Sequence, residues 1–259
     1  MRRCWMTLFY DTRSLFTRAL TKTVRNPTLL FINLFTPLLF LLLFSQLLQK
    51  LTTLPGTSGS YLAYLTPGIL ILNAVTGSFL SGMSIVNDLN SGFLHKILLT
   101  PASRTAILLG RLFNDLLIMM IQSGIIIGVA MLLGLTIATG VPGLLLIFVT
   151  LAFFDLAWSG LLLSVGLKSR KAETVSAVGN LLAFPLLFIS SALFPTSIMP
   201  AWAQTVSKYN PLSYAADVTR DLIKGGLTWG TFASAYAIIG LIAVVTFAAT
   251  LYQFRKVIS

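Results

Sequence analysis

Two aspartates inside long apolar stretches are the residues of this 259-residue chain best placed to do chemistry. Asp155 lies among aromatic residues near the middle of one stretch, and Asp115 follows Arg111 by four residues at the start of another. A carboxylate deep in a membrane is costly unless it is paired or in a wet cavity. Asp155 is therefore either an intramembrane carboxyl that binds a cation or proton, or a hydrogen-bonded structural group. The spacing of Asp115 favours an i,i+4 ion pair with Arg111 near the interface.

The residues that several common catalytic and metal sites require are absent from this sequence. With His95 as the one histidine and Cys4 as the one cysteine, a bis-His haem, an intramembrane Ser–His pair, a disulfide and a cysteine-based metal cluster are excluded. No Gly-x-x-x-x-Gly-Lys-[Ser/Thr] loop is present, so we do not expect the chain itself to bind ATP. A di-aspartyl protease needs two deep carboxylates, and we expect only Asp155 to lie deep. The sequence therefore predicts no catalytic residue, no metal and no cofactor on this chain.

The composition is that of a membrane protein. Hydrophobic residues make up 56% of the chain and charged residues 10%, and the mean hydropathy is +0.89. Soluble domains carry about 25% charged residues. Disorder, a nucleic-acid-binding domain and a typical soluble enzyme are therefore excluded. The net charge of +11 indicates basic loops on one side of a membrane rather than a nucleic-acid partner.

Six apolar stretches are long enough to cross a bilayer as helices, because a lipid-exposed backbone must satisfy its own hydrogen bonds. We predict an all-α membrane protein forming a single transmembrane domain over residues 1–259, and the predicted spans are residues 27–48, 61–86, 112–135, 143–167, 174–194 and 230–254. Small residues suited to close helix packing occur at Gly124, Gly128, Ser159 and Gly160.

The distribution of basic residues predicts the topology. Fourteen Lys and Arg residues fall on one side of the six spans and four on the other, which places both termini in the cytoplasm of a plasma or inner membrane. Residues 1–26 project as an amphipathic helix with an apolar face that includes Leu15 and a basic face that includes Arg18. We expect this helix to lie on the cytoplasmic leaflet and contact membrane lipid.

The connection between the second and third spans predicts a short amphipathic helix over residues 88–100. Asp88 or Asn90 can cap it and Pro101 stops it. Its apolar face consists of Phe93, Leu94, Ile97 and Leu98. A helix of this kind either lies in the lipid interface or docks in a groove on a soluble partner.

Prolines divide residues 195–229, on the outer side, into short pieces. Residues 201–209 and 211–224 are predicted to be helices, the second with Asn210 as its cap and Pro211 at its first position. One apolar stripe comprises Trp202, Val206 and Tyr209, and the other comprises Leu212, Ala215, Val218 and Leu222. Pieces that are too short to span and too apolar for a free loop are expected to dip back into the outer leaflet.

Motifs in these two segments resemble a known family. The first reads Asp88-x-x-x-Gly92, then Pro101-x-Ser103-Arg104 and Leu109-Gly110-Arg111. The second reads Leu193-Phe194-Pro195, then Pro200-x-Trp202, Asn210-Pro211-Leu212-x-Tyr214 and Arg220. Together with the six spans they resemble the permease subunits of ABC-2 type exporters, and most of all the daunorubicin and multidrug resistance type.

The resemblance implies a transport subunit, not an enzyme, that pairs with a second permease copy, identical or a sister chain. Two copies of a separate ABC ATPase would hold ATP and Mg. The cargo would be a lipophilic drug, lipid or lipid-like compound. The alternatives are a polysaccharide or lipo-oligosaccharide exporter of the same superfamily and an ion-coupled secondary transporter that uses Asp155.

The resemblance also implies roles for particular residues. The ATPase would contact a coupling helix through Asp88, Gly92, Phe93, Leu94, Lys96, Ile97, Pro101 and Arg104. A second cytoplasmic contact would comprise Lys168, Arg170, Lys171 and Glu173. An extracellular gate would comprise Phe194, Pro195, Pro200, Trp202, Asn210, Pro211 and Tyr214. The substrate path between two permeases would include Asn73, Thr76, Asn180 and Phe184.

Overall fold

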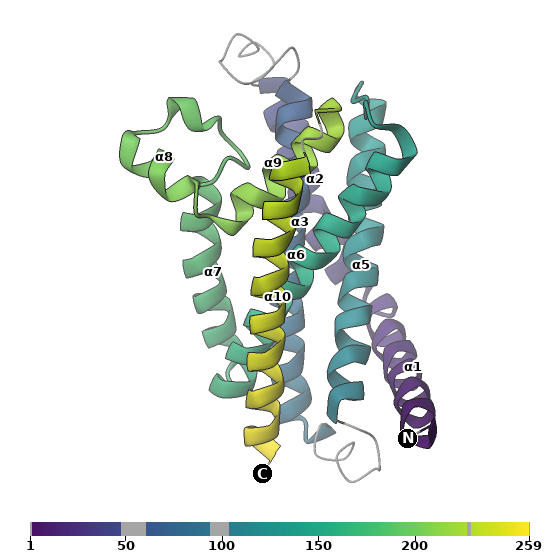
Figure 1. Cartoon of the computed structure of the whole chain (residues 1–259). Helices are drawn as coiled ribbons and strands as arrows, with labels where there is room; N and C mark the ends of the chain where they lie inside the picture. Colours follow the sequence, from purple (N-terminus) through teal and green to yellow (C-terminus); the bar gives the residue numbers. More distant parts are fainter. Residues whose placement is uncertain (1, 48–60, 94–103, 227–228, 259) are drawn as a thin grey trace.

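The computed structural model describes residues 2–47, 61–93, 104–226 and 229–258, and in these ranges it is entirely helical (Figure 1). The helices are α1 (Arg2–Val24), α2 (Pro27–Leu47), α3 (Tyr61–Asn90), α5 (Arg104–Leu132), α6 (Gly140–Ser169), α7 (Ala172–Phe188), the 3₁₀ turn η2 (Thr196–Ile198), α8 (Ala201–Ser207), α9 (Pro211–Lys224) and α10 (Trp229–Ile258). By length and composition, α2, α3, α5, α6 and α10 can each cross a membrane. The helix α7, where we expected the fifth of six spans, is apolar but has only 17 residues.

Two helices extend beyond the apolar stretches that marked them in the sequence. The helix α3 runs to Asn90, so Asp88 lies in its last turn, and the expectation that Asp88 caps the next helix is wrong. The helix α5 begins at Arg104, eight residues before the expected Leu112. Asp115 therefore lies about 16 Å from the start of α5, at 1.5 Å per residue, and not in its first turn. Helices continue through charged residues because propagation is favourable once a helix has formed.

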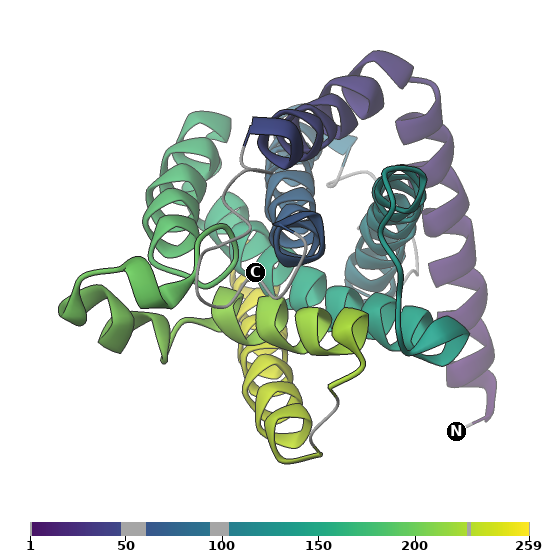
Figure 2. The ribbon, with the colours of Figure 1, turned by 90° about the horizontal axis from the view of Figure 1, so that it is seen from above.

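The helix α3 is the centre of the bundle. It packs against α6, α2, α5, α9 and α7, while α10 packs along α6 and α1 along α5. In Figure 2 the other helices surround α3 in the view along the bundle. Figure 1 shows the start of α1 and the end of α10 at one end of the bundle, with α8 and α9 at the other.

Large apolar side chains face outward on the helices at the edge of the bundle. Phe31 on α2 is 67% exposed and Val244 on α10 also 67%, whereas Ile69 and Ile71 on α3 are fully buried. A soluble protein rarely exposes such continuous apolar surface. The distribution therefore fits a chain that is surrounded by lipid.

Close approach of α3 and α6 requires glycine at one crossing. A Cβ on Gly166 would lie 2.8 Å from the carbonyl oxygen of Gly82, and a Cβ on Gly82 would lie 3.0 Å from the carbonyl oxygen of Leu162. A Cβ on Gly160 would lie 3.1 Å from the hydroxyl oxygen of Thr246 on α10, which confirms the close packing predicted for this glycine. At Gly128 no described residue of this chain lies within 4 Å of a Cβ, so close packing there is not seen within the chain. Small residues therefore bring α6 close to both α3 and α10.

Candidate functional site

Three serines spaced three residues apart on α3 interact with charged residues of neighbouring helices. Each forms one side-chain hydrogen bond of this kind: Ser78 with Asp155 on α6, Ser81 with Asp115 on α5, and Ser84 with Arg111 on α5. Residues three apart lie on one face of a helix. One face of α3 therefore carries a polar strip into an otherwise apolar bundle.

Asp155 is buried, at 2% exposure, but it is poorly hydrogen-bonded. Its Oδ1 accepts bonds from the hydroxyls of Ser78 at 3.3 Å and Ser159 at 3.5 Å. Both hydroxyls have a shorter alternative, because Ser78 donates to the carbonyl of Ala74 at 2.8 Å and Ser159 donates to Ser78 at 3.0 Å. The Oδ2 atom of Asp155 has no hydrogen-bond partner. Asp155 is thus buried near the middle of α6. Its predicted structural role as a hydrogen-bonded group is met only in part, and its predicted role as a cation or proton site stays a prediction.

Asp115 does not form the ion pair that its spacing suggested. Arg111 instead donates to Asp88 at 2.9 Å and to the Ser84 hydroxyl, which joins α5 to the end of α3. The carboxylate of Asp115 accepts hydrogen bonds from the hydroxyl of Ser81 and, at 3.3 Å, from the amide of Asn114. Because α5 begins early, Asp115 lies further along its helix than expected, and it lines the same cavity as Asp155.

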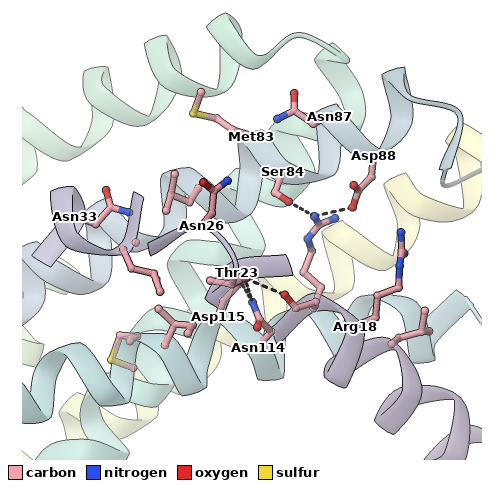
Figure 3. Close-up of a pocket in the computed structure, with 18 of the residues that line it drawn as sticks. Arg18, Thr23, Asn26, Asn33, Met83, Ser84, Asn87, Asp88, Asn114 and Asp115 are labelled. Carbon is pink, nitrogen blue, oxygen red and sulfur yellow. Dashed lines mark hydrogen bonds and ion pairs between the residues drawn. The ribbon is translucent and has the colours of Figure 1, made fainter. Parts of the chain in front are cut away.

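These groups line a cavity of about 380 Å³ between α1, α2, α3 and α5 that reaches Asp155 on α6. Figure 3 shows polar side chains from four helices around it, including Thr23 on α1, Asn33 on α2, Ser84 on α3 and Asn114 on α5. The amide of Asn114 donates to the Thr23 hydroxyl at 3.3 Å and so ties α1 to α5.

The start of the predicted coupling segment lies beside this cavity. Gly92 has a φ of +68°, a left-handed conformation that suits glycine and ends α3. The next residue, Phe93, lines the cavity, and the Arg18 guanidinium lies 3.2 Å from the centre of its ring. Arg104 is the first residue of α5, and its contact with the ATPase stays a prediction. The remaining assigned residues, Leu94, Lys96, Ile97 and Pro101, lie outside the described residues.

The second predicted cytoplasmic contact forms the connection between α6 and α7. Arg170 adopts a left-handed conformation with a φ of 56°, and its backbone N–H caps α6 at Gly166. The four assigned residues are solvent-exposed at the same end of the bundle as the chain termini: Lys168, Arg170, Lys171 and Glu173. They are therefore placed where a partner could reach them.

The predicted helices of the 195–229 segment are present, α8 ending two residues early at Ser207. The Asn210 side chain accepts a bond from the backbone of Leu212 at 3.0 Å and donates to the carbonyl of Leu186 at 2.6 Å, so it caps α9 and ties it to α7. The apolar stripe of α9 is buried, whereas Trp202 and Tyr209 are 63% and 80% exposed. Among the other residues assigned to the gate, Pro195 is buried, Phe194 and Tyr214 are half-buried, and Pro200 precedes α8.

Arg220 fastens this segment to α3, a role that the sequence did not indicate. Its guanidinium donates to the carbonyl of Ser191 at 2.7 Å and to that of Tyr64 at 3.4 Å, and it lies 3.9 Å from the centre of the Tyr64 ring. It also pairs with Asp217. Arg220 belonged to the quoted motif, but its partners lie on other elements and could not be read from the sequence.

The four residues expected along a substrate path lie on two helices, α3 and α7. Asn73 is buried and donates to Ser123 on α5 at 3.4 Å, and Thr76 donates to the backbone of its own helix. Asn180 and Phe184 are exposed on α7. None of the four lines the cavity described above.

Comparison with known proteins identifies the class to which this fold and this arrangement of helices belong. The description of the ABC-2 type transporter family matches residues 10–223, so the chain belongs to that family. It is therefore a multi-pass membrane permease, a transport subunit that is not itself catalytic and whose family normally works with an ABC ATPase.

The chain is similar to several named members of this family. It is 30% identical to the putative transport permease ycf38 of Pyropia yezoensis, over 94% of this chain and 88% of the relative. It is 28% identical to the daunorubicin resistance ABC transporter permease protein DrrB1 of Streptomyces coeruleorubidus, over 73% and 66% of the two chains. The probable doxorubicin resistance permease DrrC of Mycobacterium tuberculosis is 25% identical over 81% and 75%.

Proposed function

We propose that this chain is the membrane-spanning subunit of an ATP-driven exporter that moves a lipophilic drug, lipid or lipid-like compound out of the cytoplasm. Two copies of a separate ATPase supply ATP and Mg²⁺. The observation that carries the proposal is the family match over residues 10–223, which includes the connection between α3 and α5. The names of the drug-resistance relatives support a lipophilic cargo and the outward direction.

In this proposal α7 is the fifth of six spans and both termini are cytoplasmic. Seventeen helical residues extend about 26 Å, close to the thickness of a thin hydrocarbon core. The uneven distribution of basic residues supports placing the termini, residues 94–103 and the α6–α7 connection in the cytoplasm. The segment with α8 and α9 then lies at the outer leaflet as an extracellular gate.

The coupling segment follows α3 directly and transmits the movement of the ATPase to it. Phe93 stands at the junction, with Arg18 of α1 over its ring. Just before it, Asp88 holds Arg111 of α5. Closure of the ATPase pair therefore moves α1, α3 and α5 together. The exposed face of α7, with Leu181 at 72% and Phe184 at 55%, is the surface offered to the second permease copy.

Co-purification with a neighbouring ABC ATPase tests the proposal. We expect the native chain to retain the ATPase, and a Phe93→Asp, Leu94→Asp variant to lose it, because two carboxylates cannot enter an apolar groove without a large desolvation cost. The matched control is Trp202→Asp, Tyr209→Asp, which adds the same charge to exposed residues at the other end of the bundle and should leave binding unchanged. Equal retention of the ATPase by both variants would refute the coupling role and would favour ion-coupled transport through Asp155.

A further inference from the structure

Two residues that line the cavity each carry a hydrogen-bond acceptor that has no donor. Asp155 and Asn114 both line the cavity and are 2% and 5% exposed, and each has one side-chain oxygen without a hydrogen-bond partner. The orientation of the Asn114 amide is determined by its partners, because its nitrogen donates to the Asp115 carboxylate and to Thr23. Buried acceptors without donors are rare in folded proteins and costly. Both unpartnered oxygens therefore point to a ligand that donates hydrogen bonds.

The charges around the cavity favour a cation. Asp115 and Asp155 form no ion pair with any Lys or Arg in the described parts of the chain. The two arginines that line the cavity are engaged elsewhere, Arg111 with Asp88 and Ser84, and Arg18 with the Phe93 ring. The deep carboxylates are therefore the charges that a positive ligand would neutralise.

The size and walls of the cavity favour an organic cation over a metal ion. A volume of about 380 Å³ is within the range of sites for drug-sized ligands and far exceeds one ion. Apolar side chains form much of its wall: Leu30, Leu80, Met83, Ile118 and Met119. Among the described residues, no group of three or more His, Cys, Asp or Glu could hold a metal.

We propose that each permease chain binds a lipophilic ammonium cation in this cavity, its N–H groups donating to Asp155 Oδ2 and Asn114 Oδ1 and its apolar body lying along α2, α3 and α5. The proposal rests on the proposed function, whose cargo class it narrows to amphiphilic amines, and it places a binding site inside one chain rather than between two permeases. Asp115 provides the second negative charge and holds Asn114 in place.

Direct binding to the permease in lipid nanodiscs, without ATPase or nucleotide, tests this site. The probe is radiolabelled 1-adamantylammonium, and its neutral isostere 1-adamantanol is the matched ligand. We expect saturable binding of the amine at neutral pH, at least about tenfold tighter than that of the alcohol. Asp155→Asn should weaken amine binding at least tenfold, because truncating a buried charge pair costs that much or more. The matched control is Asp221→Asn on α9, which removes a carboxylate outside the cavity and should leave binding unchanged.

Equal binding of amine and alcohol by the native protein would overturn the proposal without depending on any variant. Unchanged amine binding by Asp155→Asn would overturn it as well, and so would full displacement of the amine by potassium or sodium chloride at physiological concentration, which would indicate a site for inorganic cations. If the native chain binds its ATPase but not the amine, the proposed exporter function is supported and only this binding site is refuted. If the native chain binds the amine but not an ATPase, the binding site is supported and the proposed exporter function is refuted.

Discussion

Replacing Arg220 with lysine should loosen the segment that contains α8 and α9 from α3 while keeping the positive charge. The guanidinium reaches the carbonyls of Ser191 and Tyr64 with one nitrogen, Asp217 with another, and stacks on the Tyr64 ring. A lysine ammonium is a point donor on a flexible chain and cannot reproduce this planar arrangement. The pair with Asp217 counts little, because that side chain is 53% exposed.

The expected loss of stability follows from the contacts that lysine cannot make. One lost hydrogen bond from a charged donor costs about 1.5–3 kcal/mol, and the lost cation–π contact costs about 0.5–1 kcal/mol. The free energy of unfolding should therefore fall by about 2–4 kcal/mol, which for a chain of this size lowers the midpoint of thermal unfolding by about 4–16 °C. The measurement is a thermal melt of the purified chain in detergent, followed by circular dichroism.

Arg13→Lys, the same change at an exposed position of α1, is the matched control and should leave the midpoint within about 1 °C of the native value. Tyr64→Phe adds a graded test, because it removes the hydroxyl bond to Ser191 but keeps the ring, and it should cost about 1 kcal/mol. If Arg220→Lys unfolds at the same temperature as its control, the buried guanidinium does not fasten the segment that contains α8 and α9, and the reasoning fails.

Three further predictions concern topology and packing. The topology can be tested in a chain whose one cysteine, Cys4, is replaced by serine. A membrane-impermeant maleimide should label Tyr209→Cys in intact cells, and should label Lys168→Cys only after the cells are lysed. The reverse pattern would show that the proposed orientation is inverted. Asn210→Ala should lower the free energy of unfolding, measured by chemical denaturation, by about 1–2 kcal/mol, because it removes the cap of α9 and the bond to Leu186. Asn210→Asp should keep the cap and lose only the bond to Leu186. In the same denaturation experiment, Gly166→Val should lower the free energy of unfolding by about 1–3 kcal/mol, whereas Gly128→Val, at a position with nothing nearby, should lower it by less than 1 kcal/mol.

Local rules predicted the parts of this fold that depend on neighbouring residues. The boundaries of α9 follow from Asn210 as cap and Pro211 as first residue, and the structure confirms both. The extents of α3 and α5 were mispredicted, because apolar length marks the part of a helix that lies in lipid and not the whole helix. Arg111 and Asp88 are charged yet helical, since each satisfies the other across the two helices.

The site was only partly predictable from the sequence, because a buried aspartate signals that it needs a partner on another element, whereas a buried serine does not. Ser78 can bond to the carbonyl of Ala74 on its own helix, so a serine in an apolar stretch needs no partner and gives little signal of a site. An aspartate has no donor in its own helical backbone and must find one on another element or in a ligand. Asp155 receives only long bonds from hydroxyls that have nearer acceptors, and one of its oxygens receives none. The carboxylate that the sequence singled out is thus one of the groups that the fold leaves unsatisfied and the one among them that is acidic, and for that reason it is the first place to look for a bound cation.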